Sequence, residues 1–221
     1  ELKEEEYLDA YLYSSIFGLI SARACYIFLH FEEFNFNILR LIVVRETPGL
    51  SLTGGLLGGL IFLSWYVKTK KMRLSHILDI FSIAAALAIS LGKIGEQLGG
   101  AGFGKETASF FGVKIVGLSN FRHPVELYEA GIFFILFILL SQFYKKTQTT
   151  EIQKMKFPKG FIFFIFSFSG CLIIFLLEFL KNYPVYLYGL SIRQIILLLV
   201  MLSLILPIIK KINIIKKLSN K

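Results

Sequence analysis

Long apolar stretches separated by short polar segments dominate this sequence. Six of them approach the length of about 20 residues that a helix needs to cross a bilayer, and they cover residues 10–31, 49–67, 77–98, 125–144, 160–181 and 190–209. The stretches are too long for strands and lack the alternation of apolar and polar positions that strands show. We therefore predict an all-α fold, a polytopic membrane helical bundle with six transmembrane helices.

The composition agrees with a membrane location. The chain has 221 residues, of which 55% are apolar and 18% charged, whereas soluble domains are about 25% charged. A soluble globular domain is thus disfavoured, and a disordered chain is excluded by the amount of apolar surface. Cys25 and Cys171 both lie inside apolar stretches, where we expect small buried side chains, not a disulfide or a zinc site.

The net charge of +9 is distributed unevenly over the segments between the stretches. The segments after the second, fourth and sixth stretches hold 14 Lys and Arg residues, whereas those on the opposite side hold five. Basic loops stay in the cytoplasm, so we predict a single integral-membrane domain, residues 1–221, with outer-side loops at 31–48 and 99–124 and a basic cytoplasmic tail at 210–221. This topology explains the charge and leaves little reason to invoke nucleic-acid binding.

Ionisable residues within the stretches gather at one depth. Such residues are costly in a bilayer and usually face a bundle interior or a wet cavity. Asp79 is expected on the inner side, whereas eight others fall near the outer side: Arg23, Lys93, Glu96, Glu126, Glu129, Glu178, Lys181 and Arg193. We predict a polar chamber that opens to the outer leaflet. For Glu126 and Arg193 the alternative is a side chain that extends to the interface from a helix end.

Three pairs of charged residues share a helical face at i, i+3 spacing: Lys93 with Glu96, Glu126 with Glu129, and Glu178 with Lys181. The first and third pairs can neutralise themselves, which is a purely structural interpretation. The second pair carries like charges and needs a cation from elsewhere, either Arg122 or Lys93.

A histidine and two groups of glycines complete the candidate chemistry. His123 precedes Pro124 at the expected start of the fourth helix, where a neutral imidazole could act as a base near pH 7. Gly54 and Gly55 are typical of close helix packing in lipid. The glycine-rich run at residues 99–104 favours a loop whose backbone N–H groups approach a ligand such as a phosphate.

Several segments also carry a family resemblance. Residues 122–129, Arg-His-Pro-Val-Glu-Leu-Tyr-Glu, resemble the HPxxLYE block of the prolipoprotein diacylglyceryl transferases. Further segments resemble that family in the same order, and these are residues 21–27 (GARxGYV), 49–58 (GLSFHGGLIG), 91–104 (GRxGNFxNxExxG), 178–181 (EFFR) and 189–194 (GxSMGQ). The likeness extends from about residue 11 to the end of the sixth stretch.

The resemblance implies a fold and a reaction. The family has seven membrane spans with its N-terminus outside, so six spans with an inside N-terminus suggest a chain that lacks the first span; it also begins with Glu1 and not Met. The family moves a diacylglyceryl group from phosphatidylglycerol to the lipobox cysteine of a secreted preprolipoprotein and releases glycerol phosphate. No metal or cofactor is implied. The expected partners are phosphatidylglycerol, signal peptides and the bilayer of a bacterial inner (plasma) membrane.

The resemblance also implies site residues. Its expected catalytic residues are His123, Glu96, Tyr128 and Glu129. The residues expected to contact the phosphate or lipid headgroup are Lys93, Lys181, Arg193, Arg23 and Gly104. Supporting residues are Glu178, Glu126, Arg122, Gly54 and Gly55. Among them His123 and Glu96 are candidate bases for the thiol, which must lose its proton to attack.

The chain departs from the family pattern at several of these positions. Thr53 stands in place of a His, Lys93 and Lys181 in place of Arg, Glu96 in place of Asn, and Ala101 in place of an acid. Lys keeps the charge of Arg but loses its planar fork, which Arg193 could restore. Two alternatives therefore stay open: a non-catalytic lipid-binding or scaffold relative, and a small transporter, although we see no paired halves with broken helices.

Overall fold

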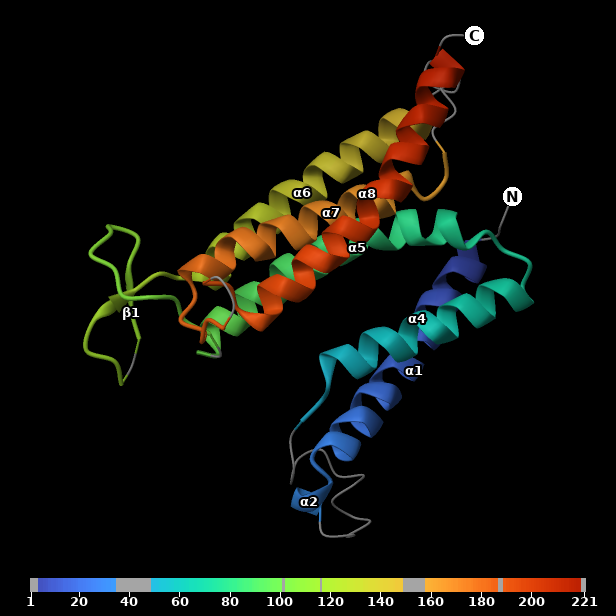
Figure 1. Ribbon diagram of the computed structural model, residues 1–221. Coiled ribbons are helices and arrows are strands. Elements are labelled where there is room, and N and C mark those ends of the chain that lie inside the picture. Colours follow the sequence, from blue (N-terminus) through green and yellow to red (C-terminus); the bar gives the residue numbers. More distant parts are fainter. Residues whose placement is uncertain are drawn as a thin grey trace. The chain divides into compact units, whose positions relative to one another are not determined.

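The computed structural model describes residues 4–34, 49–100, 102–115, 117–148, 158–186 and 189–219 (Figure 1). Within these residues, five helices are long and apolar enough to cross a membrane: Glu5–Leu29, Leu74–Leu98, Val125–Lys146, Phe161–Leu180 and Ile192–Ile215. Long helices dominate the described chain, and the prediction of an all-α membrane bundle is confirmed.

The expected span at residues 49–67 forms helix α4, Leu52–Thr69, which has 18 residues. It is not among the five helices that satisfy both the length and the hydropathy expected of a span. Four glycines and a polar end at Lys68 and Thr69 dilute its apolar content. The glycines serve a different purpose, because they set how closely α4 packs on its neighbour.

The chain divides into two compact units, Glu1–Ile77 and Leu78–Lys221, which we describe separately. In the first unit, α1 (Glu4–Leu29) packs along α4, and the short helix α2 (Phe31–Phe34) follows α1. Residues 35–48 of the expected outer-side loop lie outside the described residues. That the whole chain forms one domain stays a prediction.

Small residues hold α1 and α4 together. A Cβ added at Gly54 would lie 2.3 Å from Cys25 Cβ, and one added at Gly58 would lie 2.1 Å from Ser21 Oγ. At Gly55 it would lie 3.2 Å from Ala22 Cβ. The backbones therefore approach more closely than any larger side chain at Gly54 or Gly58 would allow, as expected for helices that associate in lipid.

The second unit contains most of α5 (Leu74–Leu98), α6 (Val125–Gln148), α7 (Phe161–Leu177) with the 3₁₀ turn η1 (Glu178–Leu180), and α8 (Ile192–Ser219). Its buried core joins Phe133, Leu136 and Leu140 of α6 with Ile162 of α7. A buried hydrogen bond of 2.8 Å, from Ser90 Oγ to the Ala130 carbonyl, ties α5 to α6.

Asp79, expected alone on the inner side, caps the start of α7. Its carboxylate accepts hydrogen bonds from the backbone N–H groups of Gly160 (2.5 Å) and Phe163 (2.9 Å). The first N–H groups of a helix lack intrahelical partners and favour a negative charge. Nearby, Lys211 Nζ donates to the Lys159 carbonyl at 2.5 Å. The expected tail at 210–221 continues α8 as far as Ser219.

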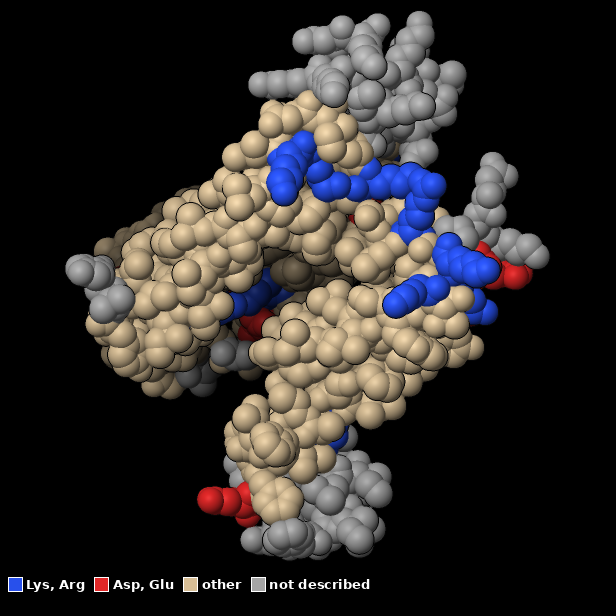
Figure 2. Space-filling model, turned by 45° about the vertical axis from the view of Figure 1, so that its right-hand side comes forward, with Lys and Arg blue, Asp and Glu red and all other residues tan. Residues whose placement is uncertain are grey.

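The outer surfaces of the helices are apolar. In the face drawn in Figure 2, uncharged residues cover most of the described surface, and the Lys and Arg side chains lie in small groups. Large side chains that are more than half exposed include Leu8, Leu19, Ile61, Trp65, Ile135, Leu139, Leu199 and Leu206. Exposed apolar surface on this scale is unfavourable in water but suits contact with lipid.

The segment between α5 and α6, expected to be an outer-side loop, contains a small antiparallel hairpin. Its strands are β1 (Val113–Lys114) and β2 (Phe121–Arg122). Isolated bridges connect Glu106 with Arg122, and Gly104 with Lys181. The loop is thereby tied both to itself and to the segment that follows α7, a local structure that the sequence analysis does not predict.

Candidate functional site

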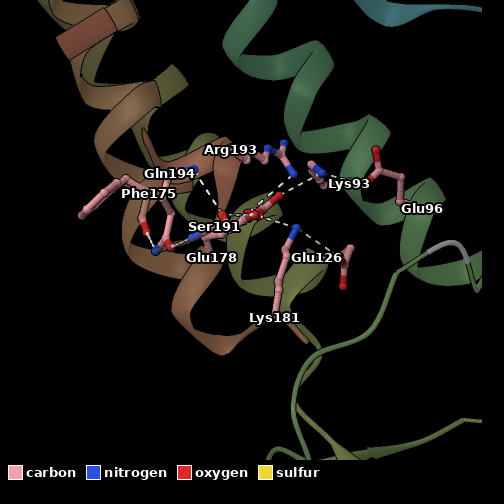
Figure 3. A network of polar contacts seen from close by, with 10 residues as sticks. Lys93, Glu96, Glu126, Phe175, Glu178, Lys181, Ser191, Arg193 and Gln194 are labelled. Carbon is pink, nitrogen blue, oxygen red and sulfur yellow. Dashed lines mark hydrogen bonds and ion pairs between the residues drawn. The ribbon is translucent and has the colours of Figure 1, made fainter. Parts of the chain in front are cut away.

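Charged side chains from α5, α6, η1 and α8 meet at one end of the second unit (Figure 3). Five of them form a chain in which carboxylates and ammonium groups alternate, in the order Glu96, Lys93, Glu129, Lys181, Glu126. We call these five residues the ion-pair chain. A neighbouring pair, Glu178 and Arg193, lies beside it in the same view.

Lys93 lies between two carboxylates. Its Nζ is 2.6 Å from Glu96 Oε2 and 2.9 Å from Glu129 Oε2. The side chains differ sharply in exposure: Glu96 is 47% exposed, Lys93 13% and Glu129 0%. The ion-pair chain therefore ends at the surface with Glu96 and continues into the unit through Glu129.

Lys181 continues the chain inside the protein. Its Nζ lies 2.8 Å from Glu129 Oε1 and 3.3 Å from Glu126 Oε1. All three side chains are at most 3% exposed. Burying a charge without a partner is very costly, so Lys181 is what allows two like charges, Glu126 and Glu129, to share the first turns of α6.

The start of α8 positions the last cation. Ser191 and Gln194 form a capping box, because the Ser191 hydroxyl accepts from Gln194 N (3.1 Å) and the Gln194 amide oxygen accepts from Ser191 N (2.9 Å). Ser191 Oγ also donates to Glu178 at 3.3 Å. Arg193 Nη1 lies 3.6 Å from the other Glu178 oxygen, and its side chain is 45% exposed.

The glycine-rich loop lies against this cluster. A Cβ added at Gly102 would lie 2.3 Å from Glu126 Oε1, so only a glycine lets the backbone approach that carboxylate. Gly104 N donates to the His123 carbonyl (3.0 Å), and Lys105 N donates to the Leu180 carbonyl (2.7 Å). The N–H of Gly104, expected at a ligand, is therefore already used within the protein.

The structure brings together seven of the charged residues that the sequence groups at one depth: Lys93, Glu96, Glu126, Glu129, Glu178, Lys181 and Arg193. The expected pair of Lys93 and Glu96 is confirmed. The other pair that could neutralise itself, Glu178 with Lys181, does not form an ion pair, because Lys181 pairs with carboxylates of α6 and Glu178 with Arg193.

Arg122 does not supply the cation for the acidic pair on α6. Its guanidinium pairs with Glu106 (3.1 Å), donates to the Gly104 carbonyl (3.3 Å) and lies over the Phe103 ring. Arg122 therefore stabilises the loop. Lys93 and Lys181 neutralise the acidic pair instead.

The two candidate bases differ in their surroundings. His123 Nδ1 lies 3.5 Å from the Tyr128 hydroxyl, and the two rings meet edge to face. Glu96 is the exposed end of the ion-pair chain. Glu129, also expected to be catalytic, is fully buried between two lysines and orients them.

Three predicted site residues belong to the first unit. Arg23 Nη1 donates to the Gly49 carbonyl at 3.1 Å, while Gly54 and Gly55 form the close contact between α1 and α4. Their roles toward a substrate stay predictions. Sequence reasoning missed Ser191 and Gln194 as contributors, although the Ser-x-x-Gln spacing was a local signal for a helix cap. Among the described residues, no group of three or more His, Cys, Asp or Glu is placed to hold a metal ion.

Known proteins resemble this chain over most of its length. The model of the family described as prolipoprotein diacylglyceryl transferase matches residues 1–210. A Clostridium botulinum protein (strain Langeland) named phosphatidylglycerol–prolipoprotein diacylglyceryl transferase is 28% identical over 227 residues, which cover 98% of this chain and 84% of that protein. A Finegoldia magna protein with the same name is 26% identical over 216 residues, covering 97% and 83%.

A third relative with that name, from Anaplasma marginale (strain Florida), is 28% identical over 151 residues, covering 66% of this chain and 53% of that protein. The matches extend over both units, and the apolar helices agree with a multi-pass membrane protein. The resemblance seen in the sequence motifs is thus confirmed. This chain belongs to the prolipoprotein diacylglyceryl transferase family.

Proposed function

We propose that this protein is a transferase that moves the diacylglyceryl group of phosphatidylglycerol to the cysteine thiol of a prolipoprotein. The family and the names of its relatives support this reaction. The structural observation that carries the proposal is the cluster of three cations at one end of the helical unit. Two of the three, Lys93 and Arg193, retain exposed side-chain surface and lie on the same side of the cluster (Figure 3).

The cations suit the leaving group. When the bond between the glyceryl carbon and the phosphate oxygen breaks, negative charge develops on the glycerol phosphate that departs. Lys93 and Arg193 would stabilise this charge from two helices, α5 and α8. Preorganised donors of this kind in a site of low dielectric account for much of enzymatic rate acceleration. Lys181 is buried, and its part is to hold Glu129 and Glu126 in place.

Glu96 is the better placed of the two candidate bases. It is the exposed carboxylate of the ion-pair chain and adjoins the phosphate-binding cation Lys93. In the proposed step the cysteine S–H proton moves to Glu96, and the thiolate attacks the glyceryl carbon. A C–S bond forms, the C–O bond to phosphate breaks, and its electron pair leaves with glycerol phosphate. His123 is the alternative base.

We place the reaction at the outer leaflet of a bacterial inner membrane. The distribution of 14 against five basic residues supports a cytoplasmic location for the segments after α4, α6 and α8. The cluster lies at the starts of α6 and α8, away from the ends that lead into the second and third of these segments, and a lipid would enter it sideways from the outer leaflet. The peptide substrate would be the signal peptide of a secreted preprolipoprotein, whose apolar segment would also lie in the bilayer.

A transfer assay tests the proposal. The protein receives phosphatidylglycerol labelled in its acyl chains and a peptide with a lipobox cysteine. We expect label on the cysteine peptide and none on a matched peptide in which serine replaces that cysteine. Label on neither peptide, from folded protein that binds the lipid, would reject the transferase function.

That negative outcome would favour the non-catalytic lipid-binding relative. One observation supports this second candidate: each of the three cations of the cluster is already paired with a carboxylate of the protein. Retained binding of phosphatidylglycerol without turnover distinguishes it from the transferase.

A further inference from the structure

The carboxylates of the cluster differ in how easily each could leave its partner. Removing Glu129 would leave two lysines, Lys93 and Lys181, with reduced neutralisation in a buried site. Removing Glu96 would not, because Glu129 still lies 2.9 Å from Lys93. Glu96 is also 47% exposed, so water can solvate it after it moves. Exposed ion pairs are weak, whereas buried ones are costly to break.

The net charge of the cluster also favours release of Glu96 when an anion binds. Four carboxylates and three cations give a formal net charge of −1 when all are ionised. Adding the singly charged phosphate of a lipid would change this net charge to −2. If the phosphate instead replaces Glu96 on Lys93, the local net charge stays at −1. An exchange of one anion for another therefore avoids accumulating negative charge beside the buried carboxylates Glu126 and Glu129.

The surface beside Lys93 suits an amphiphilic ligand. Leu91, Ile94 and Leu98 of α5 are 59%, 39% and 83% exposed. At Gly92 and Gly95 an added Cβ would meet nothing within 4 Å. Within the described residues, this end of α5 thus combines an exposed apolar surface with a cation that has an exchangeable partner.

We propose that Glu96 occupies the phosphate position on Lys93 in the lipid-free protein and that the anionic phosphate of a phospholipid displaces it. This inference rests on the proposed function and adds a coupling between its two substrates. Once displaced, Glu96 has lost its ion pair and is free to accept the proton of the thiol. Lipid binding therefore creates the base, and the lipid binds before the peptide.

Binding of phosphatidylglycerol in nanodiscs to wild type and to Glu96→Gln tests the exchange. Gln cannot pair ionically with Lys93, so the phosphate meets less competition and its Kd falls about two- to fivefold, the range for an exposed ion pair. The matched control is Glu106→Gln, since Glu106 is 55% exposed and pairs with Arg122 at 3.1 Å outside the cluster. Its Kd should equal that of wild type.

Two further measurements test which groups are responsible for a change in lipid affinity. In Glu96→Gln combined with Lys93→Gln the gain in affinity should disappear, because the gain requires the Lys93 ammonium. Titration with inorganic phosphate separates a lipid headgroup from a free anion. If Glu96→Gln binds both the lipid and inorganic phosphate more tightly than wild type does, any phosphate displaces Glu96. If it binds only the lipid more tightly, the position belongs to the lipid headgroup. Thermal unfolding of each variant verifies that it is folded.

Unchanged or weaker lipid binding by folded Glu96→Gln would overturn the inference. The same preparations are assayed for transfer to the lipobox peptide, where Glu96→Gln should lower kcat while lowering the lipid Kd. If the wild type transfers label but Glu96→Gln binds lipid no more tightly, the exchange alone is wrong. If the wild type transfers no label, the proposed function itself fails.

Discussion

Glu129 Oε1, on α6, lies 2.8 Å from the Nζ of Lys181, the residue after η1, and both side chains are almost fully buried. This contact connects two parts of the chain that are far apart in sequence, and it continues on one side to Lys93 and on the other to Glu126. The cations available to a phosphate are thus held in place by buried carboxylates, so stability and substrate binding depend on the same ion pairs.

The buried pair should dominate the stability of the second unit. Glu129→Gln leaves Lys181 with a weaker partner and should lower the free energy of unfolding by about 3–5 kcal/mol. Glu129→Gln combined with Lys181→Met should lose less than the sum of the single changes, because each single change already breaks the contact between Glu129 and Lys181 and the double variant cannot lose it twice. Denaturation in detergent, arranged as a double-mutant cycle, measures this coupling. Strictly additive losses would contradict it.

Lys93→Ala and Arg193→Ala should each reduce transferase activity. Each removes one cation from the developing charge of the leaving phosphate, so kcat should fall about 10²–10³-fold, as for loss of one preorganised donor. Lys114→Ala is the control, since Lys114 is an exposed cation on β1 outside the cluster. Activity retained in both cluster variants would remove Lys93 and Arg193 from phosphate binding.

The pH dependence should identify the base. A base must be unprotonated to accept the thiol proton, so the rate of the wild type falls as the pH is lowered through the titration of that group. Glu96→Gln should lose this acid limb along with most of its activity, whereas His123→Asn should keep it. The pH profile of kcat measures both. An acid limb that survives in Glu96→Gln and disappears in His123→Asn would assign the role to His123.

Gly102→Ala should perturb the site through the loop. The added Cβ would lie 2.3 Å from Glu126 Oε1, so the loop or the carboxylate must shift. We expect lower activity and a lower midpoint of thermal unfolding. The control is Gly131→Ala, because a Cβ at Gly131 meets nothing within 4 Å and alanine favours a helix interior. Equal behaviour of the two variants would show that the close approach at Gly102 is unimportant.

Removing the cap of α7 should destabilise the end of the unit opposite the cluster. Asp79→Ala deletes two hydrogen bonds to backbone N–H groups, from Gly160 and Phe163. Loss of a helix cap costs about 0.5–2 kcal/mol. We expect a lower midpoint of thermal unfolding with the lipid Kd unchanged. A change in Kd without a change in stability would mean that Asp79 acts on the site.

The architecture could be predicted from the sequence because it depends on local composition. Apolar stretches of span length define five of the expected helices, and even the glycines of α4 act as their spacing indicates. The hairpin of the loop was not predicted, since strands of two residues leave no periodic pattern. Residues 35–48 and 149–157 lie outside the described residues.

The sequence predicts which residues belong to the candidate site but not which of them contact one another. The common depth of the charged residues correctly grouped Lys93, Glu129 and Lys181, but helical spacing finds partners only within one helix. Spacing therefore offered Glu96 as a partner for Lys93, which is correct, and Glu178 as a partner for Lys181, which is not. Which carboxylate Lys181 contacts is decided by the packing of α6 and α7 and by the loop bridge at Gly104.

The stoichiometry of the two products decides whether the protein transfers the diacylglyceryl group to the cysteine. Phosphatidylglycerol labelled in its headgroup glycerol and a lipobox cysteine peptide are mixed with the protein, and both products are quantified by mass spectrometry. We expect one glycerol phosphate released for each peptide that gains a diacylglyceryl group on sulfur, with both products lost in Lys93→Ala. Release of glycerol phosphate without a modified cysteine, or no release by folded wild-type protein, would contradict it.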